Sequence, residues 1–246
     1  MGFKITVVFY IASAIALAIS DYLEPKSIFL LTLLYAVILA VGSLIPRLNF
    51  YLKALHVNPS RKVVITFDDG PDPINTPKIL SILKDKDVNA VFFLIGKKAL
   101  QNPEIVDQIL SEGHLIGGHT QNHDEFIGFR SKSYVMYEIK TCQDIIASIT
   151  GYDATLFRPP FGVTNPIIAK VCKELELNII GWSVRSFDTL AKSKKRLVSR
   201  VVKKAHSGSI ILLHDRLSTT AEALPDIIDG IHDKGLKFGL FPDHAI

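Results

Sequence analysis

The sequence predicts an α/β fold built on a parallel sheet or a barrel, preceded by a two-helix transmembrane hairpin. Beyond residue 62, strand-like stretches rich in β-branched and aromatic residues alternate with stretches of helical periodicity, which is the pattern of parallel α/β folds. Before residue 45, two long apolar stretches follow one another with only a short polar link. We therefore expect three parts: two helices within residues 1–45, a linker over 46–61 and one α/β domain over 62–246.

The two apolar stretches, residues 5–19 and 28–45, carry the hydrophobic excess of the chain. Hydrophobic residues make up 48 % of it and the mean hydropathy is +0.28, which is high for a soluble protein. A helix needs about 20 apolar residues to cross the hydrocarbon of a bilayer, and each stretch reaches that length with its flanks. Because residues 21–26 form so short a polar turn, the two helices must run antiparallel.

Two other interpretations of these stretches exist. The first stretch could be a cleavable signal peptide, with Lys4 as its charged start and residues 18–20 (Ala-Ile-Ser) as its cleavage site. Both stretches could instead be buried core helices, but neither shows a polar face. Membrane attachment, with membrane lipids as a partner, remains the prediction. Small residues one turn apart should pack the hairpin closely: Ala12, Ala16, Ala36 and Ala40.

The basic residues near the hairpin predict its orientation. Lys4 precedes the first stretch and only Lys26 lies in the turn. Four basic residues follow the second stretch: Arg47, Lys53, Arg61 and Lys62. Lys and Arg favour the cytoplasmic side of short flanks. We therefore expect a protein anchored in the cytoplasmic membrane, with its domain facing the cytoplasm.

Charge and cysteine content exclude several other partners. The net charge is only +4, so no nucleic-acid partner is expected. The densest basic run, residues 192–196, is typical of a solvated helix start, with weak attraction to anionic lipids as the alternative. Cys142 and Cys172 lack a metal-type spacing, and we expect both to be free core thiols. In the linker, residues 48–55 place apolar side chains at helical spacing, which leaves an interfacial helix open.

Seven strand candidates alternate with six helix candidates in the domain. The strands are expected at residues 63–67, 90–95, 115–118, 154–157, 178–184, 209–214 and 237–241. The helices are expected at residues 76–87, 97–111, 133–150, 165–175, 194–206 and 219–234. Active sites of such folds form where the carboxyl ends of the strands share one face.

Reactive side chains cluster at these strand ends. Residues 66–71 (Thr-Phe-Asp-Asp-Gly-Pro) end the first strand, and His119 follows the third. Residues 158–162 (Arg-Pro-Pro-Phe-Gly) follow the fourth strand, Asp188 follows the fifth, and His214 ends the sixth. We therefore expect these distant segments to meet in one site.

Three of these residues predict a metal site. Asp68 and Asp69 would point to opposite sides of an extended strand, but the Gly-Pro pair after them supplies a turn. His119 and His123 are four residues apart, the spacing that places two imidazoles on one side of a helical turn. With Asp69 they offer two nitrogens and a carboxylate oxygen and leave positions open for water and substrate. Zinc is the default for a non-redox hydrolase, although other divalent transition ions suit the same set.

Hydrolysis at such a metal needs a base for the attacking water and an acid for the leaving group. Asp68, next in sequence to a ligand, is placed for the first role, and His214 is placed for the second. Arg158 could hold Asp68 through a bidentate pair. A structural ion pair at a barrel rim is the equal alternative for this arginine.

Four segments in this order resemble the polysaccharide deacetylase family, carbohydrate esterase family 4 with its NodB homology domain. They are residues 66–70 (Thr-Phe-Asp-Asp-Gly), 119–123 (His-Thr-Gln-Asn-His), 158–162 (Arg-Pro-Pro-Phe-Gly) and 212–214 (Leu-Leu-His). The resemblance extends over residues 63–241. It implies a distorted (β/α) barrel of about seven strands and metal-dependent hydrolysis of the N-acetyl group of an amino sugar.

The resemblance also implies a role for each site residue. Asp68 would be the general base, Arg158 would orient it, and His214 would be the general acid. The backbone N–H of Phe161 would help to hold the oxyanion, and Leu212 would line the pocket for the acetyl methyl group. The metal ligands would be Asp69, His119 and His123.

The fourth motif of the family departs from its usual pattern. In the family an acidic residue and a Trp follow a Trp-Ser-Val-like strand, whereas here Arg185 and Thr189 occupy these positions after residues 182–184. Asp188 is then the candidate to support His214. The change argues against a polymer-binding groove and favours a smaller or lipid-linked N-acetylated sugar.

Three alternatives to this function stay open. They are an O-acetyl sugar esterase, an outward-facing deacetylase of peptidoglycan or chitooligosaccharides, and a catalytically inactive carbohydrate-binding barrel. Loss of the base or of a metal ligand would favour the inactive barrel. The chain keeps Asp68 and the three predicted ligands, which favours an active hydrolase.

Overall fold

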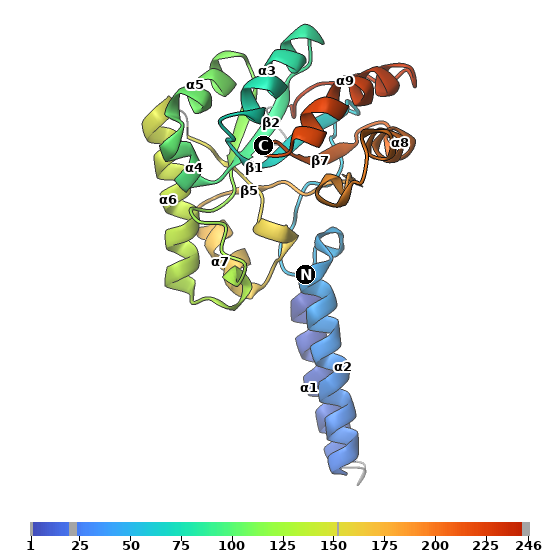
Figure 1. The fold of residues 1–246 in the computed structure, drawn as a ribbon. Helices are drawn as coiled ribbons and strands as arrows, with labels where there is room; N and C mark the ends of the chain where they lie inside the picture. The colour runs from blue at the N-terminus through green and yellow to red at the C-terminus, as the bar shows by residue number, and fades with distance from the viewer. Residues whose placement is uncertain (1, 20–23, 152, 243–246) are drawn as a thin grey trace.

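The computed structural model describes residues 2–19, 24–151 and 153–242. Figure 1 shows a pair of long helices that projects from one end of an α/β domain. Residues 21–23 of the predicted turn and residue 20 of the predicted cleavage site lie outside the described part of the chain.

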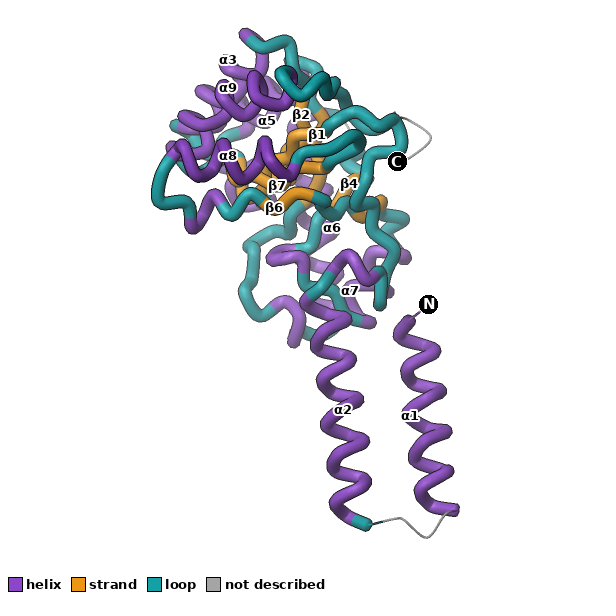
Figure 2. The backbone as a smooth tube through the Cα atoms, turned by 90° about the vertical axis from the view of Figure 1, so that its right-hand side faces the viewer, coloured by secondary structure: helices purple, strands orange, loops and turns teal. Residues whose placement is uncertain are grey.

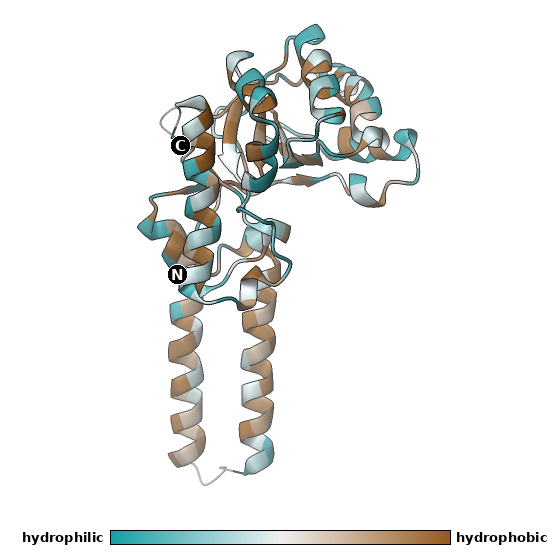
Figure 3. Cartoon of the chain, turned by 60° about the vertical axis from the view of Figure 1, so that its left-hand side comes forward, coloured by the Kyte–Doolittle hydropathy of each residue, from teal (hydrophilic) through white to brown (hydrophobic). Residues whose placement is uncertain are grey.

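The projecting pair consists of α1 (Gly2–Ile19) and α2 (Pro25–Leu44). Both helices are long and apolar enough to cross a membrane, and almost none of their surface is buried inside the protein. Figure 3 shows hydrophobic residues around both helices along most of their length. Figure 2 shows the N-terminus and the start of the domain at the same end of the pair. These features fit the predicted membrane anchor.

The two helices contact each other through aromatic and polar side chains. The rings of Tyr10 and Tyr35 stack with their centroids 4.3 Å apart, and the Tyr10 hydroxyl lies 3.2 Å from the hydroxyl of Thr32. The four alanines expected between the helices are exposed instead: Ala12, Ala16, Ala36 and Ala40. The prediction of small-residue packing is wrong because the tyrosine rings occupy the interface.

The domain end of the hairpin is packed around Phe50. A Cβ atom on Gly2 or Gly42 would press into the ring of Phe50, so the start of α1 and the end of α2 both touch this ring. The backbone N–H of Phe3 donates to the carbonyl of Phe50 at 3.1 Å. Phe50 therefore ties both helices to the linker.

A second set of contacts joins the hairpin to the domain. The Ser43 hydroxyl donates to the carbonyl of Thr164 at 2.6 Å, and the N–H of Thr164 donates to the carbonyl of Ser43 at 3.1 Å. Arg47 donates to the carbonyl of Trp182 at 3.2 Å and to that of the next residue. The linker itself forms only a single 3-10 turn, η1 (Pro46–Leu48), before it reaches the domain. The interfacial helix that the sequence left open is therefore absent from residues 46–61.

The domain is built on one parallel sheet of seven strands in the order β5-β4-β3-β2-β1-β7-β6. The strands are β1 (Val64–Gly70), β2 (Ala90–Leu94), β3 (Leu115–Gly118), β4 (Leu156–Phe157), β5 (Asn178–Ile179), β6 (Val184–Arg185) and β7 (Ile210–His214). Every residue of β1 and β2 is buried, as expected for parallel strands covered on both faces. The sheet curls into a half-barrel, which stays open because β5 and β6 are edge strands that do not pair with each other. This confirms the predicted distorted barrel.

Two strand candidates differ from the structure. The stretch at 178–184 forms β5 and β6, which lie at opposite edges of the sheet, so the chain between them crosses the open side of the half-barrel. The stretch at 237–241 forms only an isolated bridge between Val63 and Phe238. A short apolar run in the sequence does not by itself show how many of its residues will pair with a neighbouring strand.

The helices follow the sequence prediction, with one division. They are α3 (Asn75–Asp85), α4 (Gly96–Gln101), α5 (Pro103–Ser111), α6 (Lys132–Thr150), α7 (Pro166–Glu174), α8 (Lys194–Lys204) and α9 (Ser218–His232). The stretch expected to be one helix at 97–111 is divided at Asn102, because Pro103 lacks the N–H that would continue the ladder and starts α5 instead.

The core lies between the sheet and these helices. The main cluster combines apolar residues of β1, β2 and β7 with those of α3, α5, α8 and α9, and a smaller cluster lies under α6 and α7. Cys142 and Cys172 are buried and free, as predicted. This packing leaves the carboxyl ends of the strands to carry polar groups.

Replacing Gly42 with leucine should loosen the hairpin from the domain. The new side chain would overlap the Phe50 ring, and overpacking of this kind costs about 1–3 kcal/mol. The measurement is disulfide formation between Ser43→Cys and Thr164→Cys, whose backbones are hydrogen-bonded. We expect slower cross-linking with Gly42→Leu than without it. Ala40→Leu, at an exposed position of α2, is the control, and equal rates in all three proteins would contradict the contact.

Candidate active site

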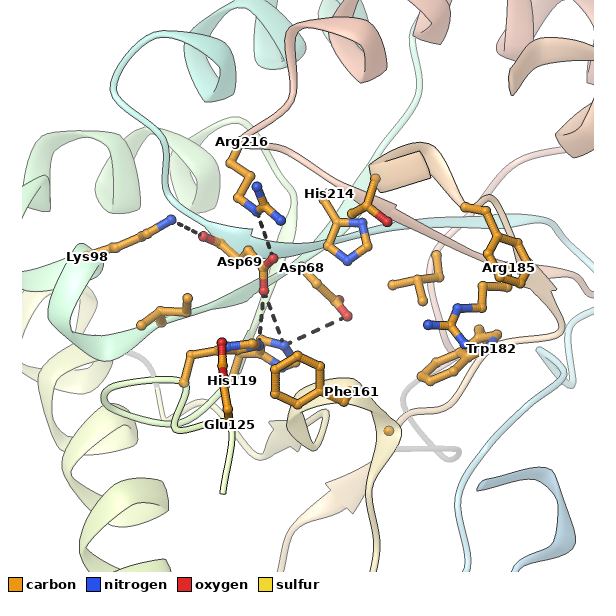
Figure 4. Close-up of a pocket in the computed structure, with 16 residues that line it drawn as sticks. Asp68, Asp69, Lys98, His119, Glu125, Phe161, Trp182, Arg185, His214 and Arg216 are labelled. Atoms are coloured by element: carbon orange, nitrogen blue, oxygen red, sulfur yellow. Dashed lines mark hydrogen bonds and ion pairs between the residues drawn. The ribbon is translucent and has the colours of Figure 1, made fainter. Parts of the chain in front are cut away.

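A pocket of about 500 Å³ opens at the carboxyl ends of the strands. Most of the site residues predicted from the sequence line it: Asp68, Asp69, His119, His123, Phe161, Leu212 and His214. Figure 4 shows Asp68, His119 and His214 converging from different elements. The structure therefore brings together segments more than a hundred residues apart.

A bulge at the end of β1 lets two consecutive aspartates face this pocket. Asp68 pairs with Phe93 and Gly70 with Leu94, so Asp69 is an extra residue in the ladder. Asp69 has a φ of 71°, an uncommon conformation for a residue with a side chain. The two aspartates therefore reach the same pocket through this bulge inside β1.

Arg158 holds Asp68 from beneath. Its Nη1 lies 2.7 Å from Asp68 Oδ1 and 2.7 Å from the hydroxyl of Thr66. Its other nitrogens donate to the carbonyls of Ile180 at 3.0 Å and Gly181 at 2.8 Å. Both ends of the Arg158–Asp68 ion pair are almost completely buried. Burial lowers the pKa of Arg158, but the charge of Asp68 opposes that change.

Asp69, His119 and His123 form a cluster with metal-ligand geometry. One ligand atom from each lies within 4.8 Å of the others. His119 Nε2 is 3.6 Å from Asp69 Oδ1, and His123 Nε2 is 3.3 Å from the same oxygen. His119 Nδ1 lies 2.7 Å from the carbonyl of Arg158. A proton on Nδ1 is required to make that bond, so Nε2 is left free to bind a metal.

The two histidines are brought together by a bent loop. Residues 119–123 lie outside any helix, and both Thr120 and His123 have positive φ values, 68° and 54°. The expected helical turn is therefore wrong, although the two imidazoles do meet, with ring centroids 5.0 Å apart. Buried Glu138 of α6 holds the loop by accepting from the N–H and the side-chain amide of Asn122, at 2.9 and 2.6 Å.

The charges of this cluster suit a metal ligand set. Burial and the neighbouring His119 lower the pKa of His123 to about 4, so its imidazole is neutral at pH 7. Burial would raise the pKa of Asp69, but the adjacent histidines and Arg216 hold it below its usual value. A neutral imidazole and an ionised carboxylate are the forms that bind metals.

His214 lies on the neighbouring strand and is supported by Asp188. Its Nδ1 is 2.8 Å from Asp188 Oδ1, and its backbone N–H donates to Asp188 Oδ2 at 2.7 Å. Thr220 of α9 also donates to this buried carboxylate, at 2.9 Å. Asp188 therefore makes the contact that the sequence suggested for it, while Arg185 and Thr189 line the pocket instead.

The pair has the protonation expected of an acid and its carboxylate partner. Burial lowers the pKa of His214, but the hydrogen bond and the charge of Asp188 outweigh this effect and raise it above the usual value. Burial raises the pKa of Asp188, and the bonds from His214 and Thr220 bring it below its usual value. The imidazole Nε2 of His214 is left to face the pocket.

Several contacts were not foreseen from the sequence. Arg216 donates to Asp69 Oδ2 at 3.0 Å, and Lys98 donates to the backbone carbonyl of Asp69 at 2.7 Å. Glu138 holds the histidine loop from the middle of α6. The position of Arg216 two residues after His214 was the one available signal for it. Phe161 contributes a half-exposed ring 4.7 Å from that of His123.

The chain matches a known family and several curated proteins in sequence. Residues 56–180, just over half of the chain, match the family model described as polysaccharide deacetylase. Peptidoglycan-N-acetylmuramic acid deacetylase PdaC of Bacillus subtilis is 36 % identical over 182 residues, which are 74 % of this chain and 38 % of that protein. A peptidoglycan-N-acetylglucosamine deacetylase of Bacillus cereus is 37 % identical over 191 residues, which are 74 % of this chain and 86 % of that protein.

The structures agree as well. The solved structure of PdaC from Bacillus subtilis matches with a TM-score of 0.68 at 34 % identity, covering 72 % of this chain and 86 % of that one. The present chain thus spans little more than a third of the full length of PdaC but most of its solved part. On the match in sequence and fold, the chain belongs to the polysaccharide deacetylase family.

Proposed function

We propose that the protein hydrolyses the N-acetyl group of an amino sugar to give acetate and a free amine. One observation carries this proposal: Asp68 and His214 are directly paired across β1 and β7, and both face the pocket beside the Asp69, His119 and His123 cluster. This arrangement supports Asp68 as the base and His214 as the acid beside a set of possible metal ligands. We further propose residues 62–246 as the catalytic unit.

Each residue has a proposed part in the reaction. Asp68, oriented by Arg158, accepts a proton from the attacking water. His214 donates its Nε2 proton to the departing amine, supported by Asp188. The backbone N–H of Phe161 is proposed to face the oxyanion, and Leu212 to contact the acetyl methyl group.

Zinc is the proposed metal. Two imidazole nitrogens and one carboxylate oxygen, close together and with neutral His123, fit zinc and other divalent transition ions. A divalent ion bound there would act as a Lewis acid on the amide carbonyl and lower the pKa of a water molecule. Arg216 and Lys98 hold Asp69 in place for this role.

The proposed substrate is an acetamido sugar carried by a lipid at the membrane surface. The pocket wall reaches the hairpin, because a Cβ on Gly162 would meet both Trp182 and Pro46, and Pro46 follows α2 directly. The same end of the domain exposes Phe126 and Phe129, whose exposed fractions are 61 % and 91 %. Exposed aromatic rings beside a membrane anchor suit the interface between lipid and water.

The loop that carries these two phenylalanines is fixed beside the hairpin. Asn165 donates to the carbonyl of Gly128 at 2.7 Å, and the preceding Thr164 is bonded to Ser43 of α2. A soluble glycan polymer would not need a pocket so close to the bilayer. A relative of the chain, named a chitooligosaccharide deacetylase, keeps a soluble oligosaccharide as the second candidate substrate.

Removing either the proposed base or the proposed acid should nearly abolish turnover. Asp68→Asn and His214→Ala should each lower kcat by roughly 10²–10⁴-fold, the usual contribution of positioned proton transfer. Elemental analysis should find metal in both variants but not in a His119→Ala/His123→Ala double variant. Near-normal kcat in either single variant, or equal metal in the double variant, would refute the assigned roles.

Replacing Asp188 with asparagine should change the pH profile. The charge of Asp188 raises the pKa of His214 against the effect of burial, so without that charge the pKa should fall. The acid must be protonated, so activity is lost as pH rises through this pKa, and the alkaline limb of kcat/KM should move to lower pH. Loss of such a supporting group should also lower activity about 10–100-fold. An unshifted alkaline limb would assign that limb to another group.

The domain is proposed to face the cytoplasm. Both ends of the hairpin lie on the domain side, so Lys4 and the basic residues after α2 share that side. Alkaline phosphatase, which is active only after export, should be inactive when fused to the C-terminus and active when fused after Glu24, at the far end of the hairpin. The reverse pattern would place the domain outside. That result would favour peptidoglycan, on which the names of several relatives say that they act.

A further inference from the structure

Arg185 and Arg200 form an unusual pair at the rim of the pocket. The guanidinium of Arg185 lies 4.8 Å from the centre of the Phe187 ring, and that of Arg200 lies 4.2 Å from the same ring. Arg200 Nε also approaches the carbonyl of Arg185 at 3.4 Å. Arg185 in addition lies 5.9 Å from the Trp182 ring. Two cations are therefore held against the same aromatic ring.

Neither charge is neutralised within the described part of the chain. The other arginines of the site are paired, Arg158 with Asp68 and Arg216 with Asp69. No described carboxylate lies within 4 Å of Arg185 or Arg200. Stacking on an aromatic ring holds a guanidinium in place without using up its in-plane donors. Both arginines are thus fixed and charged, and within the described residues their donors other than Arg200 Nε, which approaches the carbonyl of Arg185, are free to bind an anion.

The position of Arg185 follows from the way His214 is supported. The family pattern places an acidic residue at position 185, but here Asp188 already bonds the ring and the backbone of His214. A carboxylate at residue 185 is therefore not needed for that purpose. Figure 4 shows Arg185 and Trp182 on the side of the pocket opposite His119 and Glu125. This is where the part of the substrate that leads away from the metal cluster would lie.

Two further features indicate the direction and charge of that part. Trp182 accepts a hydrogen bond from Arg47, just after the hairpin, so the Arg185 side of the pocket is the side next to the membrane anchor. Beyond Arg200, the surface of α8 continues as a shallow basic hollow. Its basic residues are Lys195, Arg196, Arg200, Lys203 and Lys204. A substrate with more than one negative charge suits this surface better than a neutral one.

We propose that Arg185 and Arg200 form a subsite for the phosphate that joins the amino sugar to its lipid carrier. This inference rests on the proposed deacetylase function and narrows its substrate to a sugar phosphate or diphosphate. Two planar guanidinium groups match phosphate oxygens in bidentate geometry. The phosphate would lie between the acetamido sugar in the pocket and the bilayer beside Arg47.

The test compares a charged and a neutral substrate of the full chain in neutral detergent. The probes are N-acetylglucosamine 1-phosphate and methyl N-acetylglucosaminide. We expect the wild type to prefer the phosphate by about 10–100-fold in kcat/KM, the worth of a charge-assisted hydrogen bond. Arg185→Gln should lose most of this preference through KM, Arg200→Gln should lose part of it, and Arg185→Lys should retain part. Lys78→Gln, which removes one positive charge at an exposed position of α3, should leave the preference unchanged.

Failure of this inference can be told apart from failure of the proposed function. If the wild type hydrolyses the neutral sugar without preferring the phosphate, or if Arg185→Gln keeps the preference, the subsite is wrong and the deacetylase proposal stands. If neither probe is hydrolysed, calorimetric binding of N-acetylglucosamine 1-phosphate to the Asp68→Asn chain decides. Tight binding that Arg185→Gln removes supports the subsite, and equal binding with and without Arg185→Gln overturns it.

Two further arms identify the source of the anion. Vesicles containing phosphatidylglycerol would compete with the sugar phosphate if lipid headgroups occupied the arginine pair. Loss of the phosphate preference in such vesicles, but not in phosphatidylcholine vesicles, would overturn the sugar-phosphate assignment. N-acetylmuramic acid carries a carboxylate instead of a phosphate. An equal or greater preference for it would overturn the phosphate assignment in favour of a carboxylate.

Discussion

The buried guanidinium of Arg158 is the interaction on which the rest of the site depends. An uncompensated cation in a protein interior is very unfavourable, and here its donors are taken up by Asp68, Thr66 and the carbonyls of residues 180–181. Those carbonyls belong to the segment that crosses the open side of the half-barrel. The carbonyl of Arg158 itself orients His119. A single side chain and its backbone thus fix the proposed base, one proposed metal ligand and the segment that crosses the open side of the half-barrel.

Local sequence patterns were sufficient to predict the long strands and helices of this fold but not the short strands at the edges of its sheet. β1, β2 and β7 are buried apolar runs, and their signals lie within the runs themselves. β5 and β6 have two residues each, too few to show a period. Their separation depends on the partners that each finds across the sheet. The hairpin was recognisable from hydropathy, but its interface was not, because the choice of Tyr10 and Tyr35 over the alanines is made by the contact between the helices.

The candidate site likewise has parts that the sequence predicted and parts that it did not. Residues at strand ends were predictable because parallel strands bring their carboxyl ends together, and the family resemblance supplied roles for them. The bulge at Asp69 and the positive φ angles of Thr120 and His123 could not be predicted, since they are imposed by the surrounding loops. Glu138 and Arg216 reach the site from elements whose patterns carry no sign of it. Asp188 was foreseen only as a candidate to replace a missing acid, and one of the hydrogen bonds that hold its carboxylate comes from Thr220 on α9.

The packing of Pro46 against Gly162 and Trp182 has a consequence for how such an enzyme would encounter its substrate. A pocket attached rigidly to a membrane hairpin searches by lateral diffusion in two dimensions instead of by collision in bulk solution. The number of lipid carriers per unit area of membrane then determines occupancy, in the same way that tethering sets an effective concentration. Affinity for the free sugar can be weak under these conditions, because the bilayer supplies the proximity. Dilution of the carrier with other lipids would lower the rate even at a constant total amount of carrier.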